Sequence, residues 1–222
     1  MLYFINDYSE GAAPKILDVM AESNMSKQSG YGDDEFCISA KEKIKKAIGM
    51  DAEIFFVSGG TQANKIVIAS VLKNFEGVIA ADTGHIAVHE AGAIENTGHK
   101  VFSLKSKDGK IDAGGIKRFC ENFYADVNHE HMVYPGMVYI SQPTEYGTLY
   151  SKKELEEINK VCKEYELLLF ADGARLAYAL GSSECDTSLK SIAKLCDVFY
   201  IGGTKCGALL GEAIVFTNKD IC

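Results

Sequence analysis

The sequence predicts an α/β protein in which a mostly parallel sheet lies between two layers of helices. Two observations lead to this prediction: apolar runs of strand length recur along the chain, and longer amphipathic stretches separate them. No repeat, low-complexity tract or Pro/Gly-rich linker divides the series, so one domain is expected. The expected strands are Ile54–Val57, Val78–Ala81, Val101–Leu104, Met137–Ser141, Leu167–Ala171, Val198–Ile201 and Ala213–Phe216.

The segments between the runs have helical spacing. Before the first strand, a helix-like stretch runs from Ser39 to Ile48, and this amino-terminal segment of about 50 residues would either wrap the sheet or reach a partner subunit. After the first strand we expect a helix over Lys65–Leu72. Ser151 and Glu154 form the S-x-x-E pattern of a capping box and predict the start of another helix.

Composition narrows the function. The chain has 222 residues with 23 basic and 31 acidic side chains, a formal charge of -8 and no dense Lys/Arg block, which argues against a nucleic-acid or anionic-membrane surface. Seven cysteines without a C-x-x-C pair indicate reduced thiols. No signal-peptide pattern or membrane-spanning apolar run is present, so we expect a cytoplasmic protein with a small-molecule ligand.

Three loops that follow expected strands carry unusual chemistry, and ligands of open parallel sheets bind at such strand ends. The first is Ser58-Gly59-Gly60-Thr61-Gln62-Ala63-Asn64. Small residues at a helix start let backbone N–H groups approach an anion, and the helix dipole adds to the attraction. A tight strand-to-helix turn explains this loop equally well when it is taken alone.

The other two loops contain Asp172-Gly173-Ala174-Arg175 and Gly202-Gly203-Thr204-Lys205. A strand-end carboxylate can pair with a protonated ring nitrogen, and a guanidinium can hold a carboxylate. An Asp172–Arg175 ion pair capping the next helix is the alternative. Lys205 among small residues is a candidate nucleophilic amine, against the alternative of an exposed loop lysine. The order of the three loops is more specific than any one of them.

In this order the motifs resemble the aspartate-aminotransferase-like, fold type I superfamily of pyridoxal-phosphate enzymes, and within it the threonine aldolase and β-eliminating lyase family. The matching stretches run across nearly the whole chain. They are Tyr31-Gly32-Asp33-Asp34, Gly60-Thr61-Gln62-Ala63-Asn64, His85 with Glu90-Ala91-Gly92, Asp172-Gly173-Ala174-Arg175 and Thr204-Lys205.

The resemblance implies pyridoxal 5'-phosphate as cofactor. Lys205 would form a Schiff base with its aldehyde, and Asp172 would pair with its ring nitrogen. The cofactor phosphate would be bound by the backbone of Gly59, Gly60 and Thr61, with help from Thr204.

The resemblance also implies how the substrate is held. His85 would stack on the cofactor ring and act as a base, and Arg175 would hold the substrate carboxylate or the cofactor phenolate oxygen. Tyr31 would approach the site of a neighbouring subunit in a homodimer or homotetramer. No metal is expected, because His129 and His131 lack a third ligand at metal spacing and indicate a solvated loop.

The sequence departs from the family pattern at three places. Asn6 stands where the family commonly has a serine that helps bind the substrate carboxylate, and Glu145 stands where a histidine is often found. Family members also continue for roughly another hundred residues into a small carboxyl-terminal domain. Residues 1–222 are thus expected to be the cofactor-binding large domain without that small domain, with an apolar patch where it would dock.

Three functions remain open. The first is aldol cleavage of a β-hydroxy amino acid, such as threonine to glycine and acetaldehyde. The second is β-elimination from an amino acid, which the same motifs support. The third is a cofactor-binding domain without turnover.

Overall fold

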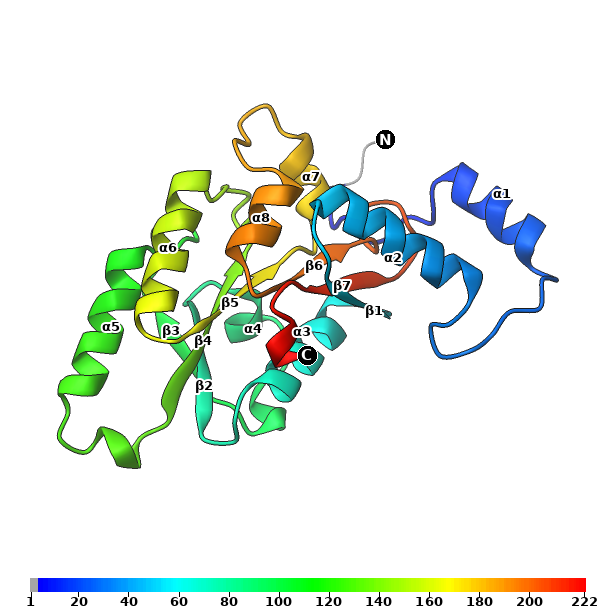
Figure 1. The fold of residues 1–222 in the computed structure, drawn as a ribbon. Helices are drawn as coiled ribbons and strands as arrows, with labels where there is room; N and C mark the ends of the chain where they lie inside the picture. The colour runs from blue at the N-terminus through cyan, green and yellow to red at the C-terminus, as the bar shows by residue number, and fades with distance from the viewer. Residues whose placement is uncertain (1–3) are drawn as a thin grey trace.

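The computed structural model describes residues 4–222, and all seven expected strands are present in one sheet. Figure 1 shows the sheet at the centre of the molecule. The strands are β1 (Glu53–Val57), β2 (Glu76–Ala81), β3 (Val101–Leu104), β4 (Tyr134–Ser141), β5 (Leu168–Asp172), β6 (Val198–Gly202) and β7 (Glu212–Phe216). Their order across the sheet is β1-β7-β6-β5-β4-β2-β3.

The prediction of a mostly parallel sheet is confirmed. Strands β2 to β6 pair in parallel, whereas β7 runs antiparallel to both of its neighbours, β6 and β1. Only the loop from Gly203 to Gly211 separates β6 from β7, too short for the helical crossover that a parallel neighbour requires. The start of β7 therefore lies at the same edge as the ends of the parallel strands.

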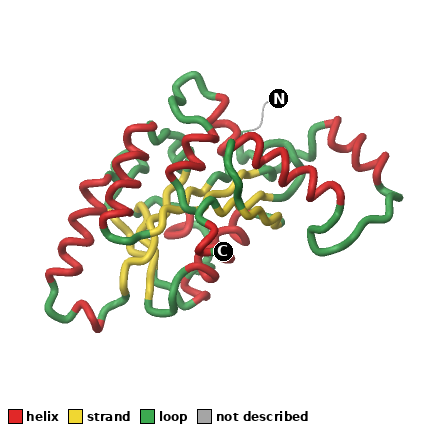
Figure 2. The backbone as a smooth tube through the Cα atoms, in the orientation of Figure 1, coloured by secondary structure: helices red, strands yellow, loops and turns green. Residues whose placement is uncertain are grey.

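Helices cover both faces of the sheet, so the predicted three-layer arrangement is confirmed (Figures 1 and 2). One layer contains α2, α5, α6 and α8, and the other contains α3 and α4. The helices are α1 (Pro14–Ser23), α2 (Glu35–Ile48), α3 (Gly60–Val71), α4 (His85–Val88), α5 (Ala113–Ala125), α6 (Lys152–Glu164), α7 (Leu176–Gly181) and α8 (Leu189–Leu195). Short 3-10 helices occupy Glu95–Thr97, His129–His131 and Lys219–Ile221.

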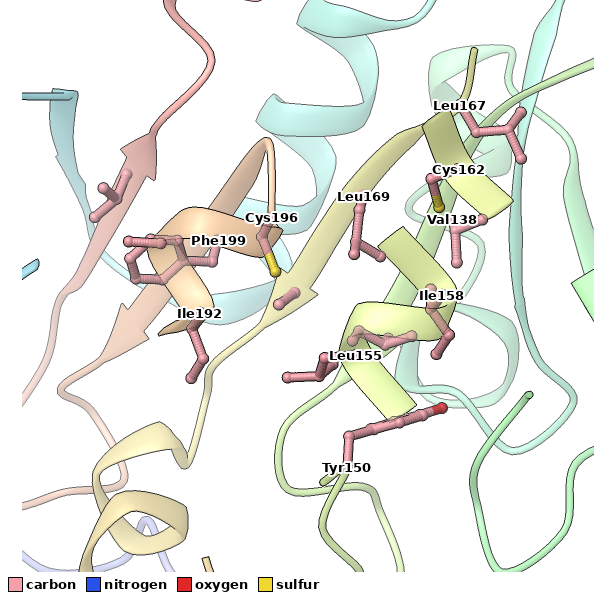
Figure 3. Packing of buried hydrophobic residues seen from close by; sticks show 14 of the residues in the cluster. Val138, Tyr150, Leu155, Ile158, Cys162, Leu167, Leu169, Ile192, Cys196 and Phe199 are labelled. Atoms are coloured by element: carbon pink, nitrogen blue, oxygen red, sulfur yellow. The ribbon is translucent and has the colours of Figure 1, made fainter. Parts of the chain in front are cut away.

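Two apolar cores form because successive strand residues point to opposite faces. Leu169 faces the layer of α6 and α8, whereas Phe170 faces the layer of α3. Figure 3 shows the first core, where Leu155 and Ile158 of α6 approach Leu169 of β5. The predicted capping box is present at the start of α6, with Ser151 as N-cap.

The amino-terminal segment lies partly outside these layers. Helix α1 has no buried residue among its 10 residues, and Figure 1 shows it projecting from the body. Helix α2 packs against α8. It begins at Glu35, earlier than the expected Ser39, because the carboxylate of Asp34 accepts a hydrogen bond from the Cys37 amide and so caps the helix.

Helix α3 also begins earlier than expected, at Gly60 rather than Lys65. The expectation failed because glycine at a first helical turn has little intrinsic helix propensity. Among the described residues, no helix is long and apolar enough to cross a membrane.

Candidate active site at the carboxyl ends of the strands

A cavity opens at the carboxyl ends of β4, β5 and β6, beside the first turn of α3. All three unusual loops meet there. The residues that line it are Gly60, Thr61, His85, Ser141, Pro143, Glu145, Asp172, Ala174, Arg175, Tyr200, Thr204, Lys205 and Glu212. The order of the strands thus brings together residues that are far apart in the sequence. This confirms the prediction that the loops after these strands meet at one edge of the sheet.

Asp172 lies at the end of β5 and is 5% exposed. Its Oδ2 accepts hydrogen bonds from the Tyr139 hydroxyl at 2.5 Å and from Asn64 Nδ2 at 3.0 Å. Its Oδ1 accepts from the Tyr200 hydroxyl at 2.5 Å and from the amide of Ala174 at 2.9 Å. These donors fix the carboxylate firmly and stabilise its negative charge.

Tyr139 and Tyr200 were not among the predicted site residues, because a tyrosine within an apolar run is typical of a core position. Both side chains are buried, and they lie in the α3-side core together with Phe170, which pairs with Tyr139. Asp172 follows Phe170 by two positions, so strand alternation places its side chain on the same face. Burial and the nearby Asp172 charge raise the pKa of both phenols well above the ordinary value, so each remains a hydrogen-bond donor.

His85 begins α4, and its Nδ1 lies 2.8 Å from Glu90 Oε1. The same Glu90 oxygen accepts a hydrogen bond from Asn64 Nδ2 at 2.7 Å. The hydrogen bond with Glu90 raises the pKa of His85, against the opposing effect of burial. Asn64 and Glu90 belong to stretches on which the resemblance rested, but they were given no role, since only the fold shows that they are neighbours.

The first turn of α3 faces the cavity. Gly59 is the N-cap in an extended conformation and no side chain caps the helix within residues 4–222. The amides of Gly60 and Thr61 have no preceding helical carbonyl and so remain available to a ligand. Space is tight at Gly60, where an added Cβ would lie 2.9 Å from the Tyr200 hydroxyl, whereas at Gly59 it would meet no atom within 4 Å.

Lys205 lies in the loop between β6 and β7, with its Nζ 6.0 Å from the centre of the Tyr8 ring. The loop is held by Glu212, the first residue of β7. Its carboxylate accepts from the Thr204 hydroxyl at 2.7 Å and from the Gly203 amide at 2.9 Å. Burial raises the pKa of Glu212. Glu212 was not predicted as a site residue, because it brings its side chain to the site only through the reversed direction of β7.

Arg175 does not pair with Asp172, so the alternative of an ion pair between them is not what the structure shows. Its guanidinium instead binds the carboxylate of Asp7 through Nε and Nη2, the latter at 2.9 Å from Oδ1. This interaction lowers the pKa of Asp7. The amino-terminal segment also contacts the loop that carries Lys205, because the Ala13 amide donates a hydrogen bond to the Gly207 carbonyl at 2.9 Å. This segment therefore runs across the cavity of its own chain.

Three of the residues named from the sequence do not line this cavity: Gly59, which immediately precedes the lining residue Gly60, and Asn6 and Tyr31. Asn6 lines an adjoining hollow together with Asp7 and Lys205, and its side chain accepts from the Tyr8 amide at 3.0 Å. Tyr31 lies between α1 and α2 with its side chain fully exposed and a φ of 65°. Their substrate-binding roles stay predictions.

Glu145, which stands in place of a family histidine, lies within the cavity. Its Oε1 accepts from the Ser141 hydroxyl at 2.6 Å and from the His85 amide at 2.8 Å. The carboxylate therefore supports the start of α4. In the part of the chain that the structure describes, no cluster of three or more His, Cys, Asp or Glu side chains has metal-binding geometry.

Comparison with known proteins identifies the family of this chain. The profile of the beta-eliminating lyase family matches residues 4–222. A low specificity L-threonine aldolase of Pseudomonas aeruginosa is 34% identical over 98% of this chain and 62% of its own length. The structure of Leishmania major threonine aldolase superposes with a TM-score of 0.94 at 48% identity, covering 99% of this chain and 63% of that one.

An aromatic aminotransferase of Pyrococcus horikoshii has the same fold, with a TM-score of 0.74 at 19% identity over 96% of this chain and 58% of that one. This chain thus spans somewhat less than two thirds of the length of the relatives it matches.

Proposed function

Because the chain belongs to the beta-eliminating lyase family, we propose that it forms the pyridoxal-phosphate-binding large domain of an enzyme that cleaves a β-hydroxy amino acid. Threonine, split into glycine and acetaldehyde, is the proposed substrate. The names of the relatives from P. aeruginosa and L. major support this reaction. The observation that carries the proposal is the meeting of Asp172, Lys205 and the α3 first turn around one cavity.

The residues of the cavity fit pyridoxal phosphate. Open space beside Gly59 and the available amides of Gly60 and Thr61 suit its phosphate. The anchored carboxylate of Asp172 suits a protonated ring nitrogen, and Lys205 supplies an amine for the aldehyde. Bound there, the cofactor supplies an electron sink for a bond at the amino-acid Cα.

The protein side chains divide the remaining work. Asp172 would face the ring nitrogen of the cofactor, and four hydrogen-bond donors hold its carboxylate in place. Arg175 binds the substrate carboxylate when it exchanges Asp7 for that ligand. His85, with Nδ1 engaged by Glu90, presents Nε2 as the atom that takes the proton of the β-hydroxyl group.

β-Elimination from an amino acid is the second candidate, and the family name supports it. The same side chains would serve it, with a proton lost from Cα and a β-substituent leaving. Product analysis separates the two reactions: glycine with an aldehyde indicates the aldolase, and a keto acid with ammonia indicates elimination. A cofactor-binding domain that turns over neither substrate is the third candidate, and a labelled Lys205 without either set of products would indicate it.

Borohydride reduction tests the cofactor assignment. We expect the chain, incubated with pyridoxal phosphate and reduced, to carry a phosphopyridoxyl group on Lys205, identified by peptide mapping. Lys205→Ala should abolish this label, and Lys105→Ala, which removes an exposed lysine after β3, should leave it unchanged. A label confined to other lysines, or none at all, would contradict the assignment.

We further propose a homodimer or homotetramer in which Tyr31 approaches the neighbouring site, and a cytoplasmic location. The exposed apolar side chains of the amino-terminal segment support the first proposal. The second is supported by the seven cysteines, all of which are free thiols.

A further inference from the structure

Glu90 places a carboxyl group behind the His85 ring, where water does not reach it. Its side chain is 0% exposed, while that of His85 is 32% exposed. One carboxyl oxygen, Oε1, meets both His85 Nδ1 at 2.8 Å and Asn64 Nδ2 at 2.7 Å. The other oxygen, Oε2, is buried without a hydrogen-bond partner among the described residues. A buried acid with half of its acceptor capacity unused costs stability, which calls for a functional reason.

We propose that Glu90 is a positioning residue that fixes the tautomer and the ring orientation of His85. The inference rests on the proposed function, in which His85 faces the cofactor and the substrate. An ionised carboxylate only accepts hydrogen bonds, so Nδ1 of His85 must carry the proton in this contact. The proton of a neutral imidazole is then on Nδ1, and the lone pair on Nε2 is left for the substrate.

Asn64 connects this arrangement to the sheet. The residue is fully buried on α3, and its Nδ2 group donates to both Glu90 Oε1 and Asp172 Oδ2, the latter at 3.0 Å. Its Oδ1 has no partner among residues 4–222, and turning the amide over would set this oxygen against two carboxylates. The orientation of Asn64 is therefore fixed, and it sets the position of Glu90 relative to the end of β5.

The charged groups around His85 act in opposite directions. Glu90 raises the pKa of His85 through the hydrogen bond and its charge, and Asp172 of β5 also raises it. Burial and the positive charge of Lys205 lower the pKa. Glu145 contacts the backbone amide of His85 from the loop after β4. The ring of His89, the residue that follows this short helix, has its centre 5.5 Å from that of His85.

Loss of the Glu90 charge should therefore lower the pKa of His85. The measurement is an NMR pH titration of the full chain labelled with 15N and 13C in histidine, with the His85 signals identified through His85→Gln. In the unchanged chain we expect a pKa above the ordinary histidine value and 15N shifts that place the neutral-form proton on Nδ1. In Glu90→Gln we expect a lower pKa and a mixture of tautomers.

Two further variants complete the test. Glu95→Gln makes the same chemical change at an exposed site nearby and should leave the His85 titration unchanged. Glu90→Asp retains the negative charge, but the shorter side chain holds it farther from His85. The pKa of His85 should therefore fall to a value between those of the unchanged chain and Glu90→Gln. This variant provides the result if Glu90→Gln fails to fold. An unchanged His85 pKa and tautomer in a folded Glu90 variant would overturn the proposal.

The titration needs no cofactor, so the two proposals fail separately. If Lys205 is labelled but the pKa and tautomer of His85 stay the same in the Glu90 variants, only the role of Glu90 is refuted. A chain in which Lys205 is never labelled would refute the proposed function, whatever the titration shows.

Discussion

At Gly173 the backbone of the site passes directly against its neighbour strand. A Cβ atom added there would lie 1.8 Å from the carbonyl oxygen of Tyr200. The close approach lets the Gly173 carbonyl accept the Gly202 amide at 2.9 Å, which joins the Asp172 loop to the lysine loop. A side chain at this position would push apart the two loops that bring Asp172 and Lys205 together.

Gly173→Ala should therefore lower the free energy of unfolding by about 3 kcal/mol, the upper part of the usual range for overpacking. The added Cβ would meet the backbone carbonyl oxygen of Tyr200, which cannot rotate away as a side chain could. Urea denaturation followed by circular dichroism measures the change. Gly181→Ala is the matched control, since its Cβ would meet nothing within 4 Å, and it should change stability by about 0.5 kcal/mol or less. Equal stability of the two variants would contradict the argument.

The site residues that the sequence revealed are those whose loop position identifies their chemistry, above all Asp172 and Lys205. Their supporting residues were not predictable in the same way. Asp7, which binds Arg175, is 168 positions away from it, and Asn64 is 108 positions from Asp172. Such pairs depend on strand order and on which face each side chain takes, and neither can be read from one local pattern.

At the scale of single elements, α6 shows how local sequence determines a helix boundary. The Ser151 hydroxyl accepts from the Glu154 amide at 3.2 Å, and the Glu154 carboxylate accepts from the Ser151 amide at 2.7 Å. Two otherwise unsatisfied amides of the first turn are thereby paired. Leu155 and Ile158 then point into the core beneath β4 and β5.

Ser151→Ala should reduce the free energy of unfolding by about 1 kcal/mol, because the Glu154 amide loses its acceptor. Thermal or urea unfolding of the purified chain would measure the loss. Ser23→Ala provides the comparison, since the Ser23 hydroxyl donates back to the carbonyls of Val19 and Met20 within exposed α1 and caps no helix start. That change should stay within about 0.5 kcal/mol. If both variants lose the same amount, the cap is not the cause.

Strands were more predictable than helices in this chain. Buried parallel strands read as continuous apolar runs, and every expected run became a strand. The short helices α4 and α7, with 4 and 6 residues, are too brief to show a helical period. Helix α1 buries nothing within its own chain, so no core-facing stripe identified it.

The exposed apolar side chains of the amino-terminal segment matter at the scale of the whole molecule. Met25 is 88% exposed and Met20 is 49% exposed. Similar side chains continue along the segment at Phe4, Ile5, Leu17, Val19, Phe36 and Ile38. An apolar surface of this kind typically marks an interface, and the proposed homodimer or homotetramer would bury it against a second copy of the chain. Where a small carboxyl-terminal domain would dock stays a prediction.

We expect the purified chain to self-associate, and Met20→Glu to raise the dissociation constant of the dimer by about tenfold or more, since burying a methionine contributes at least about 1.5 kcal/mol. Sedimentation equilibrium measures the constant. Val127→Glu, at another exposed apolar position in the loop after α5, should leave it unchanged. A chain that remains monomeric at all concentrations would exclude this interface.

The pairing of β1 with β7 has a consequence for how the protein is made. Within residues 4–222, β1 pairs with β7 alone, with Glu53 beside Phe216. During synthesis β1 must therefore wait, with both edges open, until the residues of β7, up to Phe216, have left the ribosome. The glycine loop after β1 reaches its place beside Lys205 only when β7 has joined the sheet, so capacity to bind pyridoxal phosphate would report that β1 and β7 have paired.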